Sequence, residues 1–279
     1  MRSSSRRFGT AGFAGLAAFA MMTAPGASRS DADETADWVG ARYRLWLAST
    51  DGNLRSDGNL LPGTTIDLDD KLGMDDVETV HELDAWVNVP FVPVLDRINV
   101  GYWFGTFDGE RQVDRTFTFK DRAYTAGTRV DSEMGLQVAT LTLESFLPWF
   151  GTDDLGATAG LQIGAKYFKA RGEIAAKALG FDEEESVDGP LPVVGARVLA
   201  RLTRWFRVEA EAVGIGGRYA GVEAKYIEAS VELDVLPINN VFLGVGYKAV
   251  LFDVEKTGDE EFAAEVTLQG VFVSAGVRF

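Results

Sequence analysis

From residue 38 to the end of the chain, apolar and polar residues alternate with a period of two. The clearest run lies between Leu155 and Phe168, where Leu, Ala, Ile and Tyr take every second position and Thr, Gly, Gln and Lys take most positions between. Successive side chains of a β-strand point to opposite faces of the sheet, so this run predicts a strand with one hydrocarbon face and one small or polar face. Helical periodicity is nearly absent from this part of the chain.

The same alternation recurs about ten times, in segments separated by Gly, Pro, Asn and Asp. These segments are residues 41–47, 82–89, 98–104, 129–143, 155–168, 194–202, 207–215, 227–235, 241–249 and 271–279. They predict an all-β fold of about ten antiparallel strands, and roughly eight or twelve strands would also fit the pattern.

The connections between these segments alternate in length. Short turns are expected at residues 90–96, 148–154, 203–205 and 237–240. Longer polar loops are expected at residues 51–78, 108–127, 170–189 and 253–261, and only the short connection at 218–221 breaks the order. Short turns on one side and long loops on the other are typical of a transmembrane up-and-down antiparallel β-barrel.

Charged residues of both signs occupy the polar face of nearly every segment. The set that we expect to form a charge network in the barrel lumen is Arg42, Arg44, Glu82, Asp84, Lys166, Arg197, Arg201, Glu228, Glu232 and Lys248. The solvated outer face of a sheet in a soluble protein would also carry charges. The charges by themselves therefore do not exclude a soluble β-sheet protein. A barrel of about ten strands leaves little interior space. We therefore expect a lumen largely plugged by these side chains and by the inward-facing Trp46, Trp86 and Trp103.

Aromatic residues gather at the ends of the predicted strands. Trp38, Trp149 and Trp205 lie beside short turns, whereas Phe104, Tyr167 and Tyr247 lie on the apolar parity toward the opposite ends. Aromatic side chains with an apolar body and a polar edge favour the interface between a membrane and water. These six residues are our candidates for the two interfacial belts.

The first 28 residues have the order of a cleavable signal peptide. Arg2, Arg6 and Arg7 precede an apolar stretch, residues 8–22, which is followed by small residues at 26–28. About 15 apolar residues are too few for a membrane-spanning helix, and no later segment is long enough for one. We expect residues 1–28 to be a signal peptide and residues 29–279 to form one barrel domain.

The last segment places Val273, Ala275, Val277 and the final Phe279 on one face. It resembles the C-terminal assembly signal of the small bacterial outer-membrane β-barrel superfamily, in which barrel-assembly machinery reads a last aromatic residue. The resemblance implies a monomer in a Gram-negative outer membrane, in contact with lipid and lipopolysaccharide. Upstream the apolar parity changes, which predicts either a bulge near Gly270 or a segment that stands above the membrane.

The composition narrows the possible chemistry. The chain has no Cys, which excludes thiol catalysis and Cys-ligated metals, and its formal charge of −15 opposes nucleic-acid binding. Acidic residues at 67–76 and 182–185 could hold Ca²⁺ or bridge lipopolysaccharide through divalent cations, or they could be solvated loops. They lack the EF-hand pattern, so we assign no metal site and no cofactor. Ile66, Leu68, Leu72 and Met74 suggest that the first loop packs on something, such as the barrel mouth.

His81 is the only histidine, and its position beside Glu82 and Asp84 in the sequence would suit a general base held by a carboxylate. Outer-membrane lipid A deacylases place His and Ser two apart on one strand, but position 83 here is Leu. Omptin-type proteases use an Asp-x-His pair, but position 79 here is Thr. We therefore expect no catalysis. The expected role is envelope-structural or surface interaction, with a narrow channel or small-molecule conduit as the alternative and a lipid- or peptide-modifying enzyme behind it.

Overall fold

The computed structural model shows a closed β-barrel. The residues that it describes are 38–56, 64–68, 72–74, 77–92, 94–114, 116–119, 122–148, 150–151, 155–176, 181–219, 222–238, 240–256 and 262–279. Within these ranges no helix has the length and apolar character needed to cross a membrane. Residues 1–37 and Trp149 lie outside the described residues, so the signal peptide remains a prediction.

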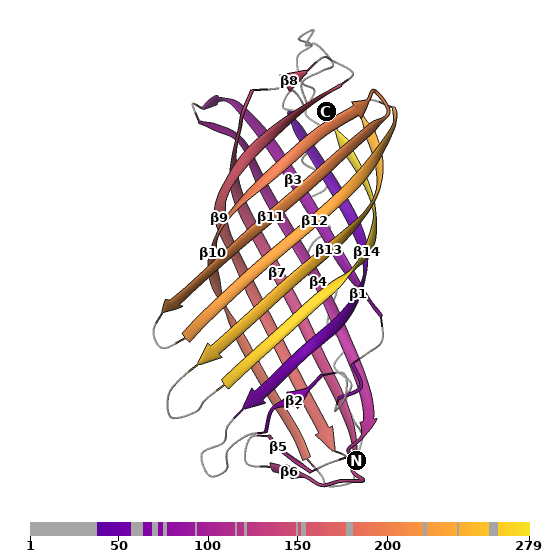
Figure 1. Ribbon diagram of the computed structural model, residues 1–279, viewed down its shortest axis with the longest axis vertical. Coiled ribbons are helices and arrows are strands. Elements are labelled where there is room, and N and C mark those ends of the chain that lie inside the picture. Colours follow the sequence, from indigo (N-terminus) through magenta and orange to yellow (C-terminus); the bar gives the residue numbers. More distant parts are fainter. Residues whose placement is uncertain are drawn as a thin grey trace, which may run out of the picture. The chain divides into compact units, whose positions relative to one another are not determined.

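Ten long strands form the wall of the barrel (Figure 1). They are β1 (Val39–Ser56), β3 (Glu78–Val92), β4 (Leu95–Gln112), β7 (Arg129–Phe146), β9 (Gly156–Ala176), β10 (Phe181–Thr203), β11 (Phe206–Tyr219), β12 (Val222–Ile238), β13 (Val241–Lys256) and β14 (Phe262–Arg278). Each pairs antiparallel with its neighbours in the chain, and β14 pairs with β1 from Gly40↔Arg278 to Ser56↔Phe262. This closure confirms the predicted up-and-down barrel of ten strands.

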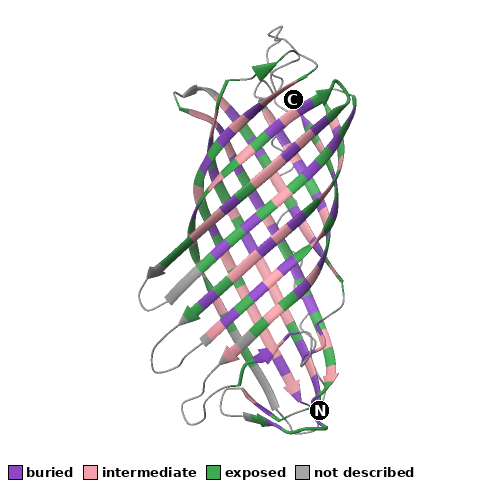
Figure 2. Cartoon of the chain, in the orientation of Figure 1, coloured by how far each residue is buried: buried purple, intermediate pink, exposed green. Residues whose placement is uncertain are grey.

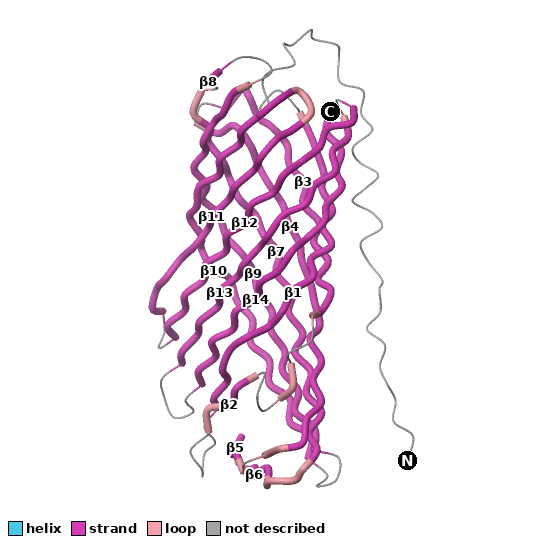
Figure 3. The backbone as a smooth tube through the Cα atoms, turned by 45° about the vertical axis from the view of Figure 1, so that its right-hand side comes forward, coloured by secondary structure: helices cyan, strands magenta, loops and turns pink. Residues whose placement is uncertain are grey.

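Four short strands lie at the ends of the barrel. β2 (Ile66–Asp67) pairs with β1, and β5 (Phe117–Phe119) forms a small hairpin with β6 (Arg122–Tyr124). These three elements lie at the end with the longer loops, which we call the loop side (Figure 3). β8 (Phe150–Gly151) pairs with β9 at the opposite end, the turn side, where the C-terminus also lies.

The two faces of the barrel wall differ sharply in polarity. Outward positions such as Val100, Leu161 and Val245 are 54%, 73% and 54% exposed, whereas inward charges such as Arg42 and Lys248 are buried. Exposed and buried positions alternate along the strands (Figure 2). An apolar exterior around a charged interior reverses the arrangement of a soluble protein and is that of a transmembrane barrel.

Beyond the apolar band, the strands extend farther on the loop side than the sequence predicted. The expected loop at residues 170–189 is wrong, because β9 and β10 pair continuously from Gly156↔Arg201 to Ala176↔Phe181. Outward Lys169, Arg171 and Glu173 make this part of β9 look like a loop in sequence. A strand that stands above the membrane needs no apolar outer face, because water solvates it.

The same extension explains the change of parity in β14. Gly270 pairs with Ala48 and Lys248, and the register through this point is continuous on both sides. Glu265 and Gln269 face outward and are exposed, whereas Leu268 is buried inside. The prediction of a bulge near Gly270 is therefore wrong, and the placement of this segment above the membrane stays a prediction.

Candidate functional site

The middle of the barrel lumen holds a network of buried charges from all sides of the wall. All ten residues proposed from the sequence lie on inward positions of their strands, with Asp84 and Arg197 less buried than the others. β1 supplies Arg42 and Arg44, two residues apart, because alternate residues of a strand share one face. The two guanidinium groups therefore both reach into the lumen.

Arg42 and Arg44 connect strands on opposite sides of β1. Arg42 donates to Glu209 at 2.8 Å and to Glu232 at 3.0 Å. Arg44 donates to the same Glu232 at 3.0 Å and, in the other direction, to Asp84 at 2.6 Å and Glu82 at 3.2 Å. The planar guanidinium with five donors suits this bridging position.

Two lysines extend the network toward the loop side. Lys166 contacts Glu228 at 2.5 Å, and Lys248 contacts Glu228 at 3.1 Å and Glu82 at 3.0 Å. The Tyr226 hydroxyl also donates to Glu228. Glu82 thus joins the lysine cluster to Arg44.

Arg197 forms a third part of the network, with carboxylates that are not among the ten residues predicted from the sequence. Its guanidinium lies 2.6 Å from Glu211, 3.1 Å from Glu144 and 3.3 Å from Glu209. Glu144 lies on the inward parity two residues beyond Thr142, so continuing the alternation of β7 to its end would have found it. Arg201 is buried and pairs in register with Arg207, on the turn side of Arg197.

An aromatic floor lies on the turn side of the charges. It consists of Trp86, Leu236 and Phe242, which form one buried cluster. The guanidinium carbon of Arg42 lies 5.0 Å from the centre of the Phe242 ring, and that of Arg97 lies 5.6 Å from Trp86. Such cation–π contacts strengthen when water is excluded.

Further cations flank this floor. Arg207 lies 4.9 Å from the Phe242 ring and donates to Asp234 at 2.6 Å. Arg97 donates to Asn88 at 2.9 Å. Sequence reasoning missed Arg97 and Arg207, although both follow the inward parity of their strands.

The loop-side limit of the charge network is a pair of tryptophans. Trp46 and Trp103 are fully or nearly fully buried and pack edge to face, with ring centres 6.3 Å apart. The Lys248 ammonium lies 5.4 Å from one ring and 5.9 Å from the other. Only about 50 Å³ of cavity remains among the charged residues between the floor and these tryptophans.

Beyond the two tryptophans the lumen becomes apolar and is covered by part of the first loop. We call the described residues 64–68 and 72–74 the cap; its Ile66, Leu68, Leu72 and Met74 are all buried. The Ser132 hydroxyl donates to the Leu72 carbonyl at 2.9 Å, and the Leu68 amide donates to Gly52 at 3.0 Å. This confirms that the first loop packs against the barrel.

The exterior aromatics lie as follows. Trp38 and Trp205 are exposed near the turn side, and Phe104, Tyr167 and Tyr247 are exposed at the loop-side edge of the apolar band. Their role as interfacial belts remains a prediction.

The assembly-signal residues also face outward. Val273, Ala275, Val277 and Phe279 are all exposed. The Phe279 carbonyl accepts hydrogen bonds from Trp38 and Val39 at 2.6 and 3.2 Å, which ties the last residue to the seam of the barrel. Recognition of this face by assembly machinery stays a prediction.

His81 lies on the outer face of the wall, away from the charge network. Its Nδ1 lies 2.6 Å from the Tyr43 hydroxyl, and its ring stacks on Phe104 with centres 5.3 Å apart. Glu82 and Asp84 point into the lumen instead. Across the described residues, no group of three or more His, Asp or Glu has the geometry of a metal site.

Comparison with solved structures finds bacterial outer-membrane β-barrels. Outer membrane protease OmpT from Escherichia coli matches 87% of this chain and 97% of its own, with 13% identity and a TM-score of 0.46. The transport unit of the autotransporter AIDA-I from Escherichia coli matches 88% and 91%, with 10% identity and a TM-score of 0.41. Ail of Yersinia pestis matches 87% and 99%, with 12% identity and a TM-score of 0.31. These values are too low to transfer an activity. No protein-family model matches the chain, and no curated protein matches it.

Proposed function

We propose that this protein is a monomeric outer-membrane barrel, closed to water-borne solutes, with an envelope-structural or surface-interaction role. The observation that carries the proposal is the buried charge network, in which the single side chain of Arg44 contacts three carboxylates, those of Glu82, Asp84 and Glu232. The apolar exterior supports contact with outer-membrane lipid and lipopolysaccharide. The exposed apolar face of β14 supports recognition by barrel-assembly machinery.

The network favours a closed lumen on energetic grounds. Removing one partner of a buried ion pair costs about 3–5 kcal/mol, because the other charge is left without compensation. A water path through the lumen would have to separate several such pairs at once. It would also have to displace Trp86 and Phe242, both of which lie against arginine side chains.

Conductance in planar bilayers tests this closure. The wild-type protein should give no steady single-channel current. A double variant, Arg44→Ala with Glu232→Ala, removes both partners of a central pair and should give measurable current steps. The matched control is Arg171→Ala with Glu184→Ala, which removes an outer-face pair of 2.9 Å and should remain silent. Steady ion-selective current in the wild type would instead support the channel alternative.

We also propose that the protein is not an enzyme. The support is the position of His81, whose ring lies among exterior aromatics while the neighbouring carboxylates face the lumen. Purified protein should leave lipid A and peptide substrates unchanged. Cleavage of either that is lost in His81→Gln would overturn this part of the proposal.

A further inference from the structure

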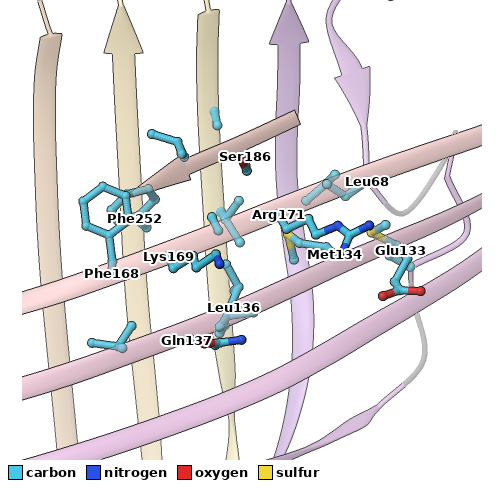
Figure 4. Close-up of a pocket in the computed structure, with 18 of the residues that line it drawn as sticks. Leu68, Glu133, Met134, Leu136, Gln137, Phe168, Lys169, Arg171, Ser186 and Phe252 are labelled. Carbon is cyan, nitrogen blue, oxygen red and sulfur yellow. The ribbon is translucent and has the colours of Figure 1, made fainter. Parts of the chain in front are cut away.

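An apolar chamber of about 110 Å³ lies in the loop-side lumen, between the two tryptophans and the cap. Its wall comes from seven barrel strands as well as the cap, and includes Leu68, Trp103, Leu136, Phe168, Val250 and Leu268. The rings of Phe168 and Phe252 lie at one side of the chamber, and Leu68 and Met134 lie at the other (Figure 4). Almost all of the surface that lines it is hydrocarbon.

This space is unusual for a protein interior. Cores are close-packed, and few voids exceed the size of a water molecule. A dry cavity forfeits dispersion contacts along its whole lining, whereas an apolar guest restores them. Engineered apolar cavities of about 150 Å³ stay free of water and bind benzene, so the chamber has the size of a small ring or a few carbons.

The polar groups near the chamber indicate that a bound molecule would be uncharged. Lys248 is nearby, but it lies against the Trp46 and Trp103 rings and is already paired with Glu82 and Glu228. Trp103 lines the chamber, and its indole N–H has no hydrogen-bond acceptor among the residues that the structure describes. Glu133, Lys169 and Arg171 also belong to the chamber wall, but they lie on the outward parity of β7 and β9. An ionic guest would therefore lose its hydration without gaining a partner charge inside the lumen.

We propose that this chamber binds one small, neutral, apolar molecule of the class of monocyclic aromatic compounds, with at most one hydrogen-bond acceptor for Trp103. Binding would take place above a lumen that the charge network closes. The inference therefore goes beyond the structural role and does not require transport.

Two glycines provide a matched pair of variants. Gly172 on β9 lines the chamber, and a Cβ atom added there would meet nothing within 4 Å. Gly135 on β7 has equally open space, but the alternation of its strand places it on the outer face. Gly172→Phe should therefore fill the chamber, whereas Gly135→Phe adds the same bulk outside it.

The experiment is ¹⁹F NMR of fluorobenzene with the protein in lipid nanodiscs, using empty nanodiscs to subtract partitioning into lipid. The wild type and Gly135→Phe should show a saturable bound component that excess toluene displaces. In Gly172→Phe the apparent affinity should fall at least tenfold. Heat-modifiable mobility on gels verifies that each variant is folded.

A second chamber variant and its matched control keep the test valid if Gly172→Phe does not fold. Ala170→Leu adds bulk at a chamber position, and Ala139→Leu adds it at an exposed outer position. Absence of a saturable component in the wild type would overturn the proposal. So would binding that survives in both chamber variants, or that falls equally in the chamber variants and their controls. Conductance is measured separately, so failure here leaves the proposed closure of the lumen to its own test.

Discussion

Glu82 accepts hydrogen bonds from cations on two different strands, Arg44 of β1 and Lys248 of β13. Its carboxylate is thus a junction between the arginine and lysine parts of the network. The sequence predicts the inward orientation of Glu82 but not its partners. Alternation places Glu82 inside the barrel, but the choice of partners depends on how the ten strands close, which no local pattern contains.

Neutralising this junction should destabilise the barrel. Glu82→Gln leaves Arg44 and Lys248 with less compensation, and we expect the free energy of unfolding to fall by about 3 kcal/mol. The exposed Glu265 on β14 provides the control, since Glu265→Gln should change it by less than about 0.5 kcal/mol. The measurement is urea-induced unfolding in lipid vesicles. Equal effects of the two variants would show that the network does not stabilise the fold.

Glu133 lies on the outer face of β7 and, unlike Glu82, has carboxylates and not cations as its cross-strand neighbours. It pairs in register with Asp108 on one side and Glu173 on the other. Partial burial, followed by the charges of Asp108 and Glu173, raises the pKa of the Glu133 carboxyl. Like charges on directly opposed strand positions destabilise a sheet.

This geometry predicts a pH dependence. A carboxyl whose pKa is raised in the folded state binds protons more tightly there, so its contribution to stability is lost as pH rises through the folded pKa. Glu133→Gln should therefore raise the unfolding temperature at about pH 8 and change it little at about pH 4, where the wild-type carboxyl is largely protonated. Thermal melts of both proteins at the two pH values provide the measurement. A variant that is less stable than wild type at about pH 8 would contradict this account.

Among the elements, β1 and β3 show how small residues admit the aromatic floor. Gly40 pairs in register with Trp86, and a Cβ atom at Gly40 would lie 2.1 Å from the Trp86 ring. The sequence predicted Trp86 inside the lumen from its parity. It did not reveal that this glycine makes room for the ring, because the contact crosses between strands.

Gly40→Ala should therefore force Trp86 to move and lower the stability by about 1–3 kcal/mol, the usual effect of overpacking. In a Trp86→Leu background the clash is absent, so adding Gly40→Ala there should lower the stability by less than it does in the wild type. Gly135→Ala, where space is open, is the control and should be nearly neutral. If Gly40→Ala melts like wild type, the floor is not packed against β1 as described.

The loop-side ends of β9 and β10 were predicted wrongly, as a loop, from the sequence pattern. Lys169 and Arg171 suggested a loop because they break the apolar parity, yet they pair with Gln137 and Gly135 in a continuous ladder. The pattern expected of a membrane strand is an apolar outer face and a polar inner face. On the loop side the outward residues are polar and the inward residues of β9 line an apolar chamber, so that pattern no longer marks the strand. The cap was predicted more successfully, because Ile66, Leu68, Leu72 and Met74 retain an apolar pattern within an acidic loop.

At the scale of the whole molecule, the distribution of polarity is inverted. All ten wall strands contribute buried charges to the inside of the barrel, while Leu161, Ile163 and Val194 are more than half exposed outside it. In water, this exterior would form one apolar patch around the barrel, far larger than soluble monomers expose. The account therefore depends on lipid covering that surface.

The most direct test is sedimentation velocity of the purified protein, first in detergent and then after removal of all amphiphile. We predict a folded monomer in detergent, with heat-modifiable mobility, and aggregation or precipitation once the detergent is gone. A folded, monodisperse monomer in plain buffer would contradict the assignment of the apolar face to lipid.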